Sequence, residues 1–354
     1  MIVSVEAKAQ IAQGLYEGLM GNSGAALSDP TAPSYYNPSL LNRKVKDSYS
    51  LSGNTIGTLT SRSDSAEINS FALNPGYLST ILVGDRLVHE IFIANTSPSK
   101  FKIVAKLDGP DSVAKFEQTI DQTQFLFGYS MAFKSIPFAL SYFGQFTQKE
   151  ISGFGEYTSL SSNLRSTTSV KGDFKALGLG VSVSGYATTG GYTFGYNLKT
   201  RQLIVYKKDE TTNSSFVHGG TSPTDYGRYD STYQNQTVVT NGSSFIIGHG
   251  FQNGDHEFTT DSEFKETSDL NYKFVMTQTF GYKLNSASGH QLLAGLNHQI
   301  GPDVKYLGQS TYYSVGYSWL KNSLRSVLGG YVYTSKIGQD VFAAGLTFGS
   351  EFTY

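Results

Sequence analysis

Two histidines flank a tight turn in a chain that has few other residues able to do chemistry. His249 and His256 stand on either side of Asn253-Gly254, so a hairpin at this turn would place them on adjacent strands. Histidines arranged in this way can bind zinc, but a zinc site needs at least a third protein ligand, and none follows at a suitable spacing. The chain has no cysteine, which excludes thiolate ligands and disulfides. We therefore expect these histidines to be structural or solvent-exposed, with no metal and no other cofactor.

No motif of an enzyme is visible. The sequence contains no G-x-S-x-G nucleophile elbow, and Gly178-Leu179-Gly180 lies in a strand pattern with no helix after it, so it is not a nucleotide-binding loop. A barrel lipase that takes Ser and His from adjacent strands stays open on motif alone. The net charge is −1 without a polybasic stripe, which argues against a nucleic-acid partner. We expect a protein that is not an enzyme.

The elements around these residues are strands. From about Ser48 onward apolar and polar residues alternate, which is typical of strands with one apolar and one polar face. The run over 269–284 is much longer than the ~5–6 residues of a globular strand and suits the roughly 9–11 that a tilted strand needs to cross a bilayer. On its polar face, Lys283 is expected to point into a lumen, where it is solvated or pairs with an inward acid such as Glu351.

About fourteen such runs can be counted. Short turns join many of them, and longer polar connections are expected at 97–116, 151–169 and 208–233. An even number of long alternating strands with short turns on one side and longer loops on the other is the signature of an outer-membrane β-barrel. The expected strands are 48–62, 68–83, 86–96, 117–132, 136–150, 170–185, 189–207, 234–252, 255–268, 269–284, 289–300, 306–319, 323–334 and 340–354.

The fold class is therefore all-β, a transmembrane antiparallel barrel of about fourteen strands over residues 48–354. A soluble β-sandwich or a secreted β-solenoid is the alternative, although such folds seldom keep aromatic faces through so many long hairpins. The chain ends in an alternating run in which Gly349, Phe352 and Tyr354 fit a polar-x-Gly-x-x-aromatic-x-aromatic pattern. That ending resembles the signal by which bacterial outer-membrane assembly machinery recognises its substrates.

Almost fifty residues precede the first strand, and we expect them to form a plug inside the barrel. Residues 11–20 suit a short helix that Gly21 and Gly24 would end. The stretch SYYNPSLLN follows, and its Asn-Pro step favours a turn because proline disfavours the α region for the residue before it. Residues 1–47 are thus the expected plug, and its candidate ligand-contacting residues are Tyr35, Tyr36, Asn37, Pro38, Ser39, Leu40 and Leu41.

The small-residue stretch at 18–26, an acidic Asp29 and then Asn37-Pro38-Ser39 resemble the N-terminal hatch of the FadL family of outer-membrane long-chain fatty acid transporters. Ser39 stands where the family usually has Ala. The expected fourteen strands also match the family fold. The third family strand carries a kink that opens the barrel wall, and Asn95 and Pro98 mark a corresponding site here, since proline removes a ladder donor. An ordinary loop start is the alternative reading of that site.

The resemblance implies passive uptake of a long-chain fatty acid or similar hydrophobic small molecule across the bacterial outer membrane, gated by the hatch and released sideways. The implied partners are this molecule, outer-membrane lipid and the barrel assembly machinery. The polar connections favour a second function, a FadL-related barrel that serves as a scaffold or as a subunit of a secretion or assembly complex and binds another envelope protein. A general porin is a third option, which would need charged rings in the lumen and no plug.

Overall fold

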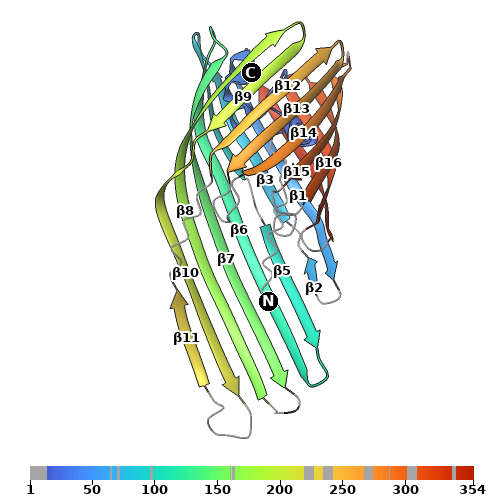
Figure 1. Cartoon of the computed structure of the whole chain (residues 1–354). Helices are drawn as coiled ribbons and strands as arrows, with labels where there is room; N and C mark the ends of the chain where they lie inside the picture. The colour runs from blue at the N-terminus through green and yellow to red at the C-terminus, as the bar shows by residue number, and fades with distance from the viewer. Residues whose placement is uncertain are drawn as a thin grey trace.

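The computed structural model describes residues 14–63, 66–69, 72–95, 99–159, 161, 164–218, 227–233, 242–266, 274–286, 288–300, 309–336 and 340–354. Three short helices come first and strands follow to the end of the chain (Figure 1). The helices are α1 (Tyr16–Leu19), α2 (Pro33–Tyr36) and the 3-10 helix η1 (Pro38–Arg43). The strands are β1 (Ser48–Ser63), β2 (Ala66–Asn69), β3 (Ala72–Val83), β4 (Leu87–Asn95), β5 (Ser99–Asp108), β6 (Ser112–Phe133), β7 (Phe138–Ser159), β8 (Leu164–Thr189), β9 (Tyr192–Lys199), β10 (Leu203–His218), β11 (Gly227–Tyr233), β12 (Ser244–Asn253), β13 (His256–Glu266), β14 (Phe274–Asn285), β15 (His290–Ile300), β16 (Gln309–Lys321), β17 (Leu324–Lys336) and β18 (Asp340–Thr353).

The strands form one closed antiparallel barrel. β1 pairs with β18 from Ser48 opposite Thr353 to Ser61 opposite Val341, which joins the first strand to the last. Closure matters because an open sheet edge in hydrocarbon would leave backbone amides unpaired. None of the described helices is long and apolar enough to span a membrane.

The eighteen strand segments fill fourteen positions around the barrel, because four positions each hold two segments in line. β2 and β3 both pair with β1, and β4 and β5 both pair with β6. β9 and β10 both pair with β8, while β11 and β12 pair with β10 and β9 respectively. The predicted barrel of fourteen strands is confirmed.

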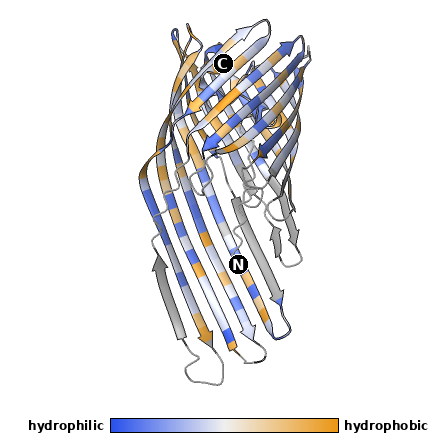
Figure 2. Ribbon diagram, viewed as in Figure 1, coloured by the Kyte–Doolittle hydropathy of each residue, from blue (hydrophilic) through white to orange (hydrophobic). Residues whose placement is uncertain are grey.

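The side chains alternate as the sequence predicts, with apolar residues outside and polar residues inside. Phe127, Tyr142 and Phe280 are exposed on the outer surface. Ser130 and Ser141 face inward and share a hydrogen bond of 2.6 Å between their hydroxyls. Figure 2 shows hydrophobic and hydrophilic residues alternating along many of the strands. This polarity is the reverse of that of a soluble barrel and suits a lipid surrounding.

One side of the barrel is far taller than the other. β6, β7 and β8 contain 22, 22 and 26 residues, about twice what a tilted strand needs to cross a bilayer. In Figure 1 these strands, with β5, β10 and β11, continue past the rest as a wall, which we call the long wall. The opposite end of the barrel carries the short turns, such as the one between β3 and β4, and is called the short-turn end.

The prediction of polar loops at 97–116, 151–169 and 208–233 is wrong, because strands of the long wall fill most of these ranges. Ser112 pairs with Ser159, and Val217 pairs with Ser166 and with Gly227. Each strand supplies backbone partners for the next, so the ladder continues through polar, Thr- and Ser-rich sequence. The ranges 151–169 and 208–233 have little apolar alternation to reveal a strand, whereas Phe101, Ile103, Ala105 and Leu107 do alternate in the first range.

The N-terminal segment, defined as the described residues 14–47, is enclosed by the strands. α1 covers only Tyr16–Leu19, and Gly21 follows it with a φ of +69°. The first residues of the helix expected over 11–20 lie outside the described residues. β1 begins at Ser48, where the first strand is predicted to begin.

Candidate functional site

The N-terminal segment packs against the inner face of the barrel on several sides. Leu19 lies in a buried cluster with Leu293 of β15 and Val327 of β17. The hydroxyl of Tyr312 on β16 donates to the carbonyl of Gly18 at 3.0 Å. α1 therefore combines apolar contact with a hydrogen bond at its carboxyl end, where helix carbonyls lack internal partners.

Asn37 joins two parts of the segment to the wall. Its side-chain amide donates to the carbonyl of Ala25 at 2.7 Å and to that of Gly185 on β8 at 3.3 Å. Its Oδ1 accepts from the backbone N–H of Ser39 at 3.2 Å and from the Ser39 hydroxyl at 2.6 Å. Pro38 is the first residue of η1, where no N–H is needed. The predicted Asn-Pro corner is thus fully buried. We call the hydrogen bonds of Asn37 to Ala25, Gly185 and Ser39 the bracket.

Tyr35 and Tyr36 present their carbonyls to β9. Lys199 donates from Nζ to the carbonyl of Tyr35, and Asn197 donates from its amide to that of Tyr36, both at 2.8 Å. Lys199 also lies over the ring of Tyr35, 4.8 Å from its centroid. Burial raises the pKa of both tyrosines above the ordinary value, so their hydroxyls stay protonated.

The last predicted residues of the site lie against β8 and β4. The N–H of Ser39 donates to the hydroxyl of Ser184 at 2.9 Å. Leu40 and Leu41 are fully buried, and Leu41 shares a cluster with wall residues that include Val88. The seven predicted residues from Tyr35 to Leu41 therefore lie in the part of the N-terminal segment that packs on the wall.

Carboxylates on the wall accept backbone N–H groups of the segment, which the sequence did not predict. Asp261 of β13 accepts from Gly24 at 2.7 Å and from Ala25 at 2.9 Å. Glu90 of β4 accepts from Ser34 at 3.0 Å. These hydrogen bonds join the segment to β13 and β4, so the two acids fix the path of the segment. The sequence could have indicated these acids only through their place on the inward, polar face of alternating strands.

Glu257 holds a third point of the segment. It accepts from the N–H of Ser28 at 2.6 Å and from the Ser28 hydroxyl at 2.7 Å. Lys283 forms an ion pair with it at 2.5 Å, and both side chains are almost fully buried. Lys283 does face the lumen, but its partner is Glu257, so the expected partner Glu351 is wrong.

Glu351 belongs to an ion cluster that ties the segment to the last two strands. Lys44 lies 3.0 Å from Asp29 and 3.1 Å from Glu351, and Arg325 lies 2.8 Å and 3.2 Å from the same two acids. Burial alone would raise the pKa of Asp29, but the Lys44 and Arg325 cations outweigh it and hold the pKa well below its usual range. Burial opposes the charge of Lys44, yet Asp29 and Glu351 raise its pKa above the ordinary value. Asp29 and Lys44 are therefore charged at neutral pH.

Two residues of the predicted assembly signal, Gly349 and Phe352, lie on opposite faces of β18, and the third, Tyr354, directly follows the strand. Phe352 and Tyr354 are exposed on the outer surface, and Tyr354 stacks on Tyr49 of β1 with ring centroids 5.3 Å apart. Gly349 faces inward, where a Cβ would overlap the side chain of Leu15. The glycine therefore has a packing role at the N-terminal segment, apart from any role in assembly.

Two further wall glycines allow the segment to lie directly on the strands. A Cβ on Gly195 of β9 would overlap the carbonyl of Ala25, and one on Gly295 of β15 would overlap the backbone of Gly21. Close approach of two backbones is the reason for glycine at these positions. No larger residue fits without moving the segment.

An apolar cluster lies where the segment meets β3, β4, β6 and β7. The rings of Tyr77 and Phe92 stack within it, with centroids 5.9 Å apart. Half-buried Tyr35 packs on its border. The cluster is apolar and closed to solvent. Its buried members are Ala32, Tyr36, Tyr77, Phe92, Ala94, Leu126 and Phe143.

The backbone ladder between the second and third barrel positions is described in two pieces, one between β3 and β4 and one between β2 and β5. Tyr77 lies opposite Ala94 in the first piece and Asn69 lies opposite Lys102 in the second, so the two pieces keep one register. β4 ends at Asn95, and β5 begins at Ser99. Pro98, the other residue of the predicted kink, lies outside the described residues. Tyr77 and Ala94 belong both to the cluster and to the β3–β4 ladder.

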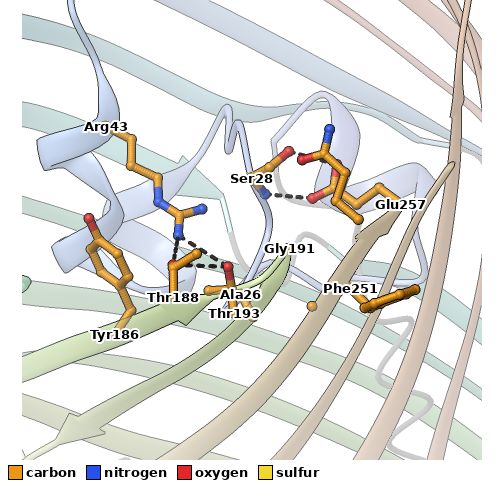
Figure 3. A pocket seen from close by; sticks show the side chains of 11 residues that line it. Ala26, Ser28, Arg43, Tyr186, Thr188, Gly191, Thr193, Phe251 and Glu257 are labelled. Atoms are coloured by element: carbon orange, nitrogen blue, oxygen red, sulfur yellow. Dashed lines mark hydrogen bonds between the residues drawn. The ribbon is translucent and has the colours of Figure 1, made fainter. Parts of the chain in front are cut away.

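A cavity of about 430 Å³ lies between the segment and the wall near the short-turn end (Figure 3). Arg43 borders it and donates to the hydroxyls of Thr188 and Thr193 at 2.7 Å and 3.2 Å. The guanidinium lies 4.5 Å from the ring centroid of Tyr186. Ser28, on the opposite side, also belongs to the segment, so a shift of the segment would change the size of this cavity.

The two histidines at the β12–β13 turn do not form a metal site. His249 lies opposite Thr260, and His256 lies opposite Asn253, so the two histidines are not cross-strand neighbours. His249 is hydrogen-bonded to Tyr192, and His256 is hydrogen-bonded to Tyr282. Within the described part of the chain, no group of three His, Cys, Asp or Glu residues could hold a metal ion.

Comparison with known proteins supports the fold. No protein-family model matches the sequence, and no curated protein is significantly similar to it. The toluene transporter TodX of Pseudomonas putida matches with a TM-score of 0.65 and 12% identity, over 97% of this chain and 98% of that one. The monoaromatic hydrocarbon channel CymD matches with a TM-score of 0.64 and 11% identity, over 98% of this chain and 99% of that one. A FadL homologue of Pseudomonas aeruginosa matches with a TM-score of 0.59 and 11% identity, over 98% and 99%.

The chain has the fold of the FadL-family channels. The predicted resemblance to this family is confirmed at the level of fold, and the FadL-type barrel resembles bacterial outer-membrane transporters. Identities of 11–12% relate backbones rather than sites. The function therefore has to be argued from the side chains described above.

Proposed function

We propose that this protein is an outer-membrane channel for the passive uptake of a hydrophobic small molecule, with residues 1–47 as its hatch and residues 48–354 as its barrel. The observation that carries the proposal is the apolar cluster in which Ala32 and Tyr36 of the hatch pack on wall residues of β3, β4, β6 and β7. A molecule bound there is next to the barrel wall. It does not react, because a channel needs no catalytic group.

The cluster suits a fatty acid or an aromatic hydrocarbon. An acyl chain gains roughly 0.8 kcal/mol for each CH₂ that it buries, so a few methylene groups suffice for useful affinity. The lining of Phe92, Leu126 and Phe143 also offers aromatic contacts. The similar channels TodX and CymD are a toluene transporter and a monoaromatic hydrocarbon channel, which supports the choice of an apolar ligand.

Release is sideways, through the wall between β3 and the β4–β5 junction at Asn95 and Pro98. A lateral exit lets an apolar molecule pass into lipid without crossing water. The bracket at Asn37 and the ion cluster at Asp29 hold the hatch in place, and Tyr35 and Tyr36 on the hatch border the cluster. A small movement of the hatch therefore changes the binding site.

The outer-membrane location brings lipid and the barrel assembly machinery as partners. Phe352 on the last strand and Tyr354 directly after it are exposed, so an assembly factor could contact them. Gly349 completes the proposed signal. The short-turn end would face the periplasm, as in other barrels of this kind.

The test is ligand binding by the purified protein in detergent. We expect saturable binding of a fluorescent long-chain fatty acid and competition by toluene. The double change Asn37→Ala with Pro38→Ala should alter uptake into proteoliposomes while the barrel still folds. Absence of both binding and uptake by the folded wild type would refute the channel.

The long wall favours a second function, as a scaffold for another envelope protein. Its strands from β5 to β8, with β10 and β11, offer a large polar surface beyond the barrel. Stable co-purification of an envelope protein, lost when the wall residues 151–169 are replaced by a short turn, together with no binding of the fluorescent fatty acid, would establish this function instead.

A further inference from the structure

Four histidines on the outer surface of the barrel are each hydrogen-bonded through Nδ1 to a tyrosine hydroxyl on the neighbouring strand. They are four of the six histidines of the chain. The rings of each pair also lie side by side, with centroids between 5.6 and 6.0 Å apart. We call these pairs the His–Tyr girdle; they are His89–Tyr129, His249–Tyr192, His256–Tyr282 and His290–Tyr317.

All four pairs repeat one geometry. His89 lies opposite Met131 and bonds to Tyr129, two residues before Met131 on β6. His249, His256 and His290 bond in the same diagonal way to a tyrosine on a neighbouring strand. Diagonal neighbours on one face are within reach of long side chains, so the pairing follows from register.

All four pairs lie near the short turns. His256 and His290 are the first residues of β13 and β15, and Tyr192 is the first residue of β9. His89 follows the turn between β3 and β4 closely. Outward apolar residues, such as Ile91 and Phe258, continue from the pairs toward the other end of the barrel. The girdle therefore marks the boundary of the apolar belt, where the headgroups of one leaflet lie.

The pairing leaves one nitrogen of each ring available. When the tyrosine hydroxyl donates to Nδ1, the neutral imidazole carries its hydrogen on Nε2. Within the described residues, none of these Nε2 atoms has a hydrogen-bond partner. Each pair thus offers an N–H donor to the surroundings of the barrel.

We propose that the His–Tyr girdle binds the phosphate groups of phospholipids in the leaflet at the short-turn end. The phosphate oxygens are the acceptors, and the acyl chains lie on the outward apolar residues beside each pair. The pairs are spread over eight strands around the barrel, from β4–β6 to β15–β16, which suits a surrounding bilayer and not a single compact partner. The inference rests on the proposed membrane location and not on transport.

The test compares lipids bound to the purified protein by native mass spectrometry. The variant replaces His89, His249, His256 and His290 with Phe, which keeps the ring and removes the donor. A matched control is His298→Phe, because His298 is also on the outer face, on β15, but bonds to Thr311 at 3.0 Å. The probes are phosphatidylglycerol, a diacylglycerol with the same chains, and soluble glycerol 3-phosphate.

We expect the fourfold variant to retain about tenfold less phosphatidylglycerol than the wild type, since each lost hydrogen bond to a charged group lowers affinity by about this factor. Diacylglycerol binding should be unchanged, and glycerol 3-phosphate should not displace the lipid. Unchanged phosphatidylglycerol binding, an equal loss in His298→Phe, or an equal loss of diacylglycerol would overturn the proposal. Displacement by glycerol 3-phosphate would also overturn it, because the site would then be one for free phosphate.

A second variant tests the girdle even if the fourfold histidine variant does not fold. This variant keeps the histidines and replaces their four partners, Tyr129, Tyr192, Tyr282 and Tyr317, with Phe. Nδ1 then has no tyrosine donor, so the ring hydrogen can lie on Nδ1 or on Nε2 and the Nε2–H donor is present only part of the time. We expect a severalfold smaller retention of phosphatidylglycerol. Unchanged retention in this set would count against the girdle. Binding of the fluorescent fatty acid should be the same in all of these proteins, which separates this test from that of the channel.

Discussion

Asn37 and Ala25 are joined inside the barrel by a hydrogen bond of 2.7 Å from the side-chain amide to the carbonyl oxygen. The contact links η1 to the loop after α1, and Asp261 of the wall receives the N–H of the same Ala25. The N-terminal segment is therefore held by two kinds of hydrogen bond, those between its own residues and those to the barrel wall. A change at Asn37 affects the whole bracket.

Replacing Asn37 with Ala should loosen the N-terminal segment without opening the barrel. Removal of the amide leaves the Ala25 carbonyl and the Ser39 groups without their partner, and a buried polar group left unpaired costs about 1–3 kcal/mol. Hydrogen exchange of residues 14–47 should rise severalfold, while exchange in β13 and β17 stays slow. Asn253→Ala, at an exposed turn, is the control. Equal exchange in the Asn37 variant and wild type would contradict the bracket.

Filling the apolar cluster should block uptake. Ala94 is almost fully buried and points into the cluster, so Ala94→Trp places a large ring where the ligand is proposed to lie. Ile93, its neighbour, is 42% exposed on the outer face, and Ile93→Trp is the matched control. We expect about tenfold slower proteoliposome uptake for Ala94→Trp and wild-type uptake for Ile93→Trp.

Folding of both tryptophan variants is checked by the shift in electrophoretic mobility on heating that folded barrels show. If Ala94→Trp folds and transports at the wild-type rate, the ligand does not pass through the cluster. If Ile93→Trp is slowed equally, the effect arises from the lipid side of the wall.

The barrel could be predicted from sequence because a bilayer imposes a period-two pattern that few other surroundings impose. Phe280 and Tyr282 lie on the outer face and Lys283 lies inside, as the alternation indicates. The long wall was missed for the same reason. Much of the long wall has no regular apolar face, so residues such as Ser112 and Ser166 carry no periodic signal even though they pair.

The contacts of the N-terminal segment could be predicted only where both partners are close together in the sequence. The Asn37-Pro38 corner was visible because a side chain caps its own helix. The acceptor role of Asp261 was not, because Gly24 lies 237 residues away along the sequence. An inward acid on a strand is consistent with solvation, an ion pair or a bound N–H, and only the register of distant strands decides among them.

The ion cluster should keep the segment docked over a wide range of pH. The folded pKa of Asp29 lies below its ordinary value of 3.8, so its contribution is present above 3.8 and is lost as pH falls through the lowered pKa. The folded pKa of Lys44 lies above its ordinary value of 10.5, so its contribution is present below 10.5 and is lost as pH rises through the raised pKa.

The measurement is the difference between wild type and Asp29→Asn in the protease sensitivity of the N-terminal segment. Because Asn cannot titrate, this difference isolates Asp29 from other groups. It should be constant between about pH 5 and pH 9 and should shrink in stronger acid. A difference that vanishes near neutral pH would show that Asp29 is not charged in the docked segment.

Gly349 offers a choice between two roles that one rescue experiment can separate. Gly349→Ala introduces a Cβ that overlaps the side chain of Leu15, so the substitution should weaken docking of the N-terminal segment. A Cβ at position 349 would also overlap the backbone carbonyl of Leu51 on β1, which Leu15→Ala leaves in place. If packing against the segment is the cause, adding Leu15→Ala should therefore restore part of the slow exchange in residues 14–47, because the smaller side chain removes the overlap at position 15. If Gly349 acts through recognition by the assembly machinery, Gly349→Ala should instead lower the amount of barrel in the outer membrane, and Leu15→Ala should not restore it. Phe352→Ala is the control, since its side chain is 47% exposed on the outer face and cannot reach the segment; it should affect assembly alone.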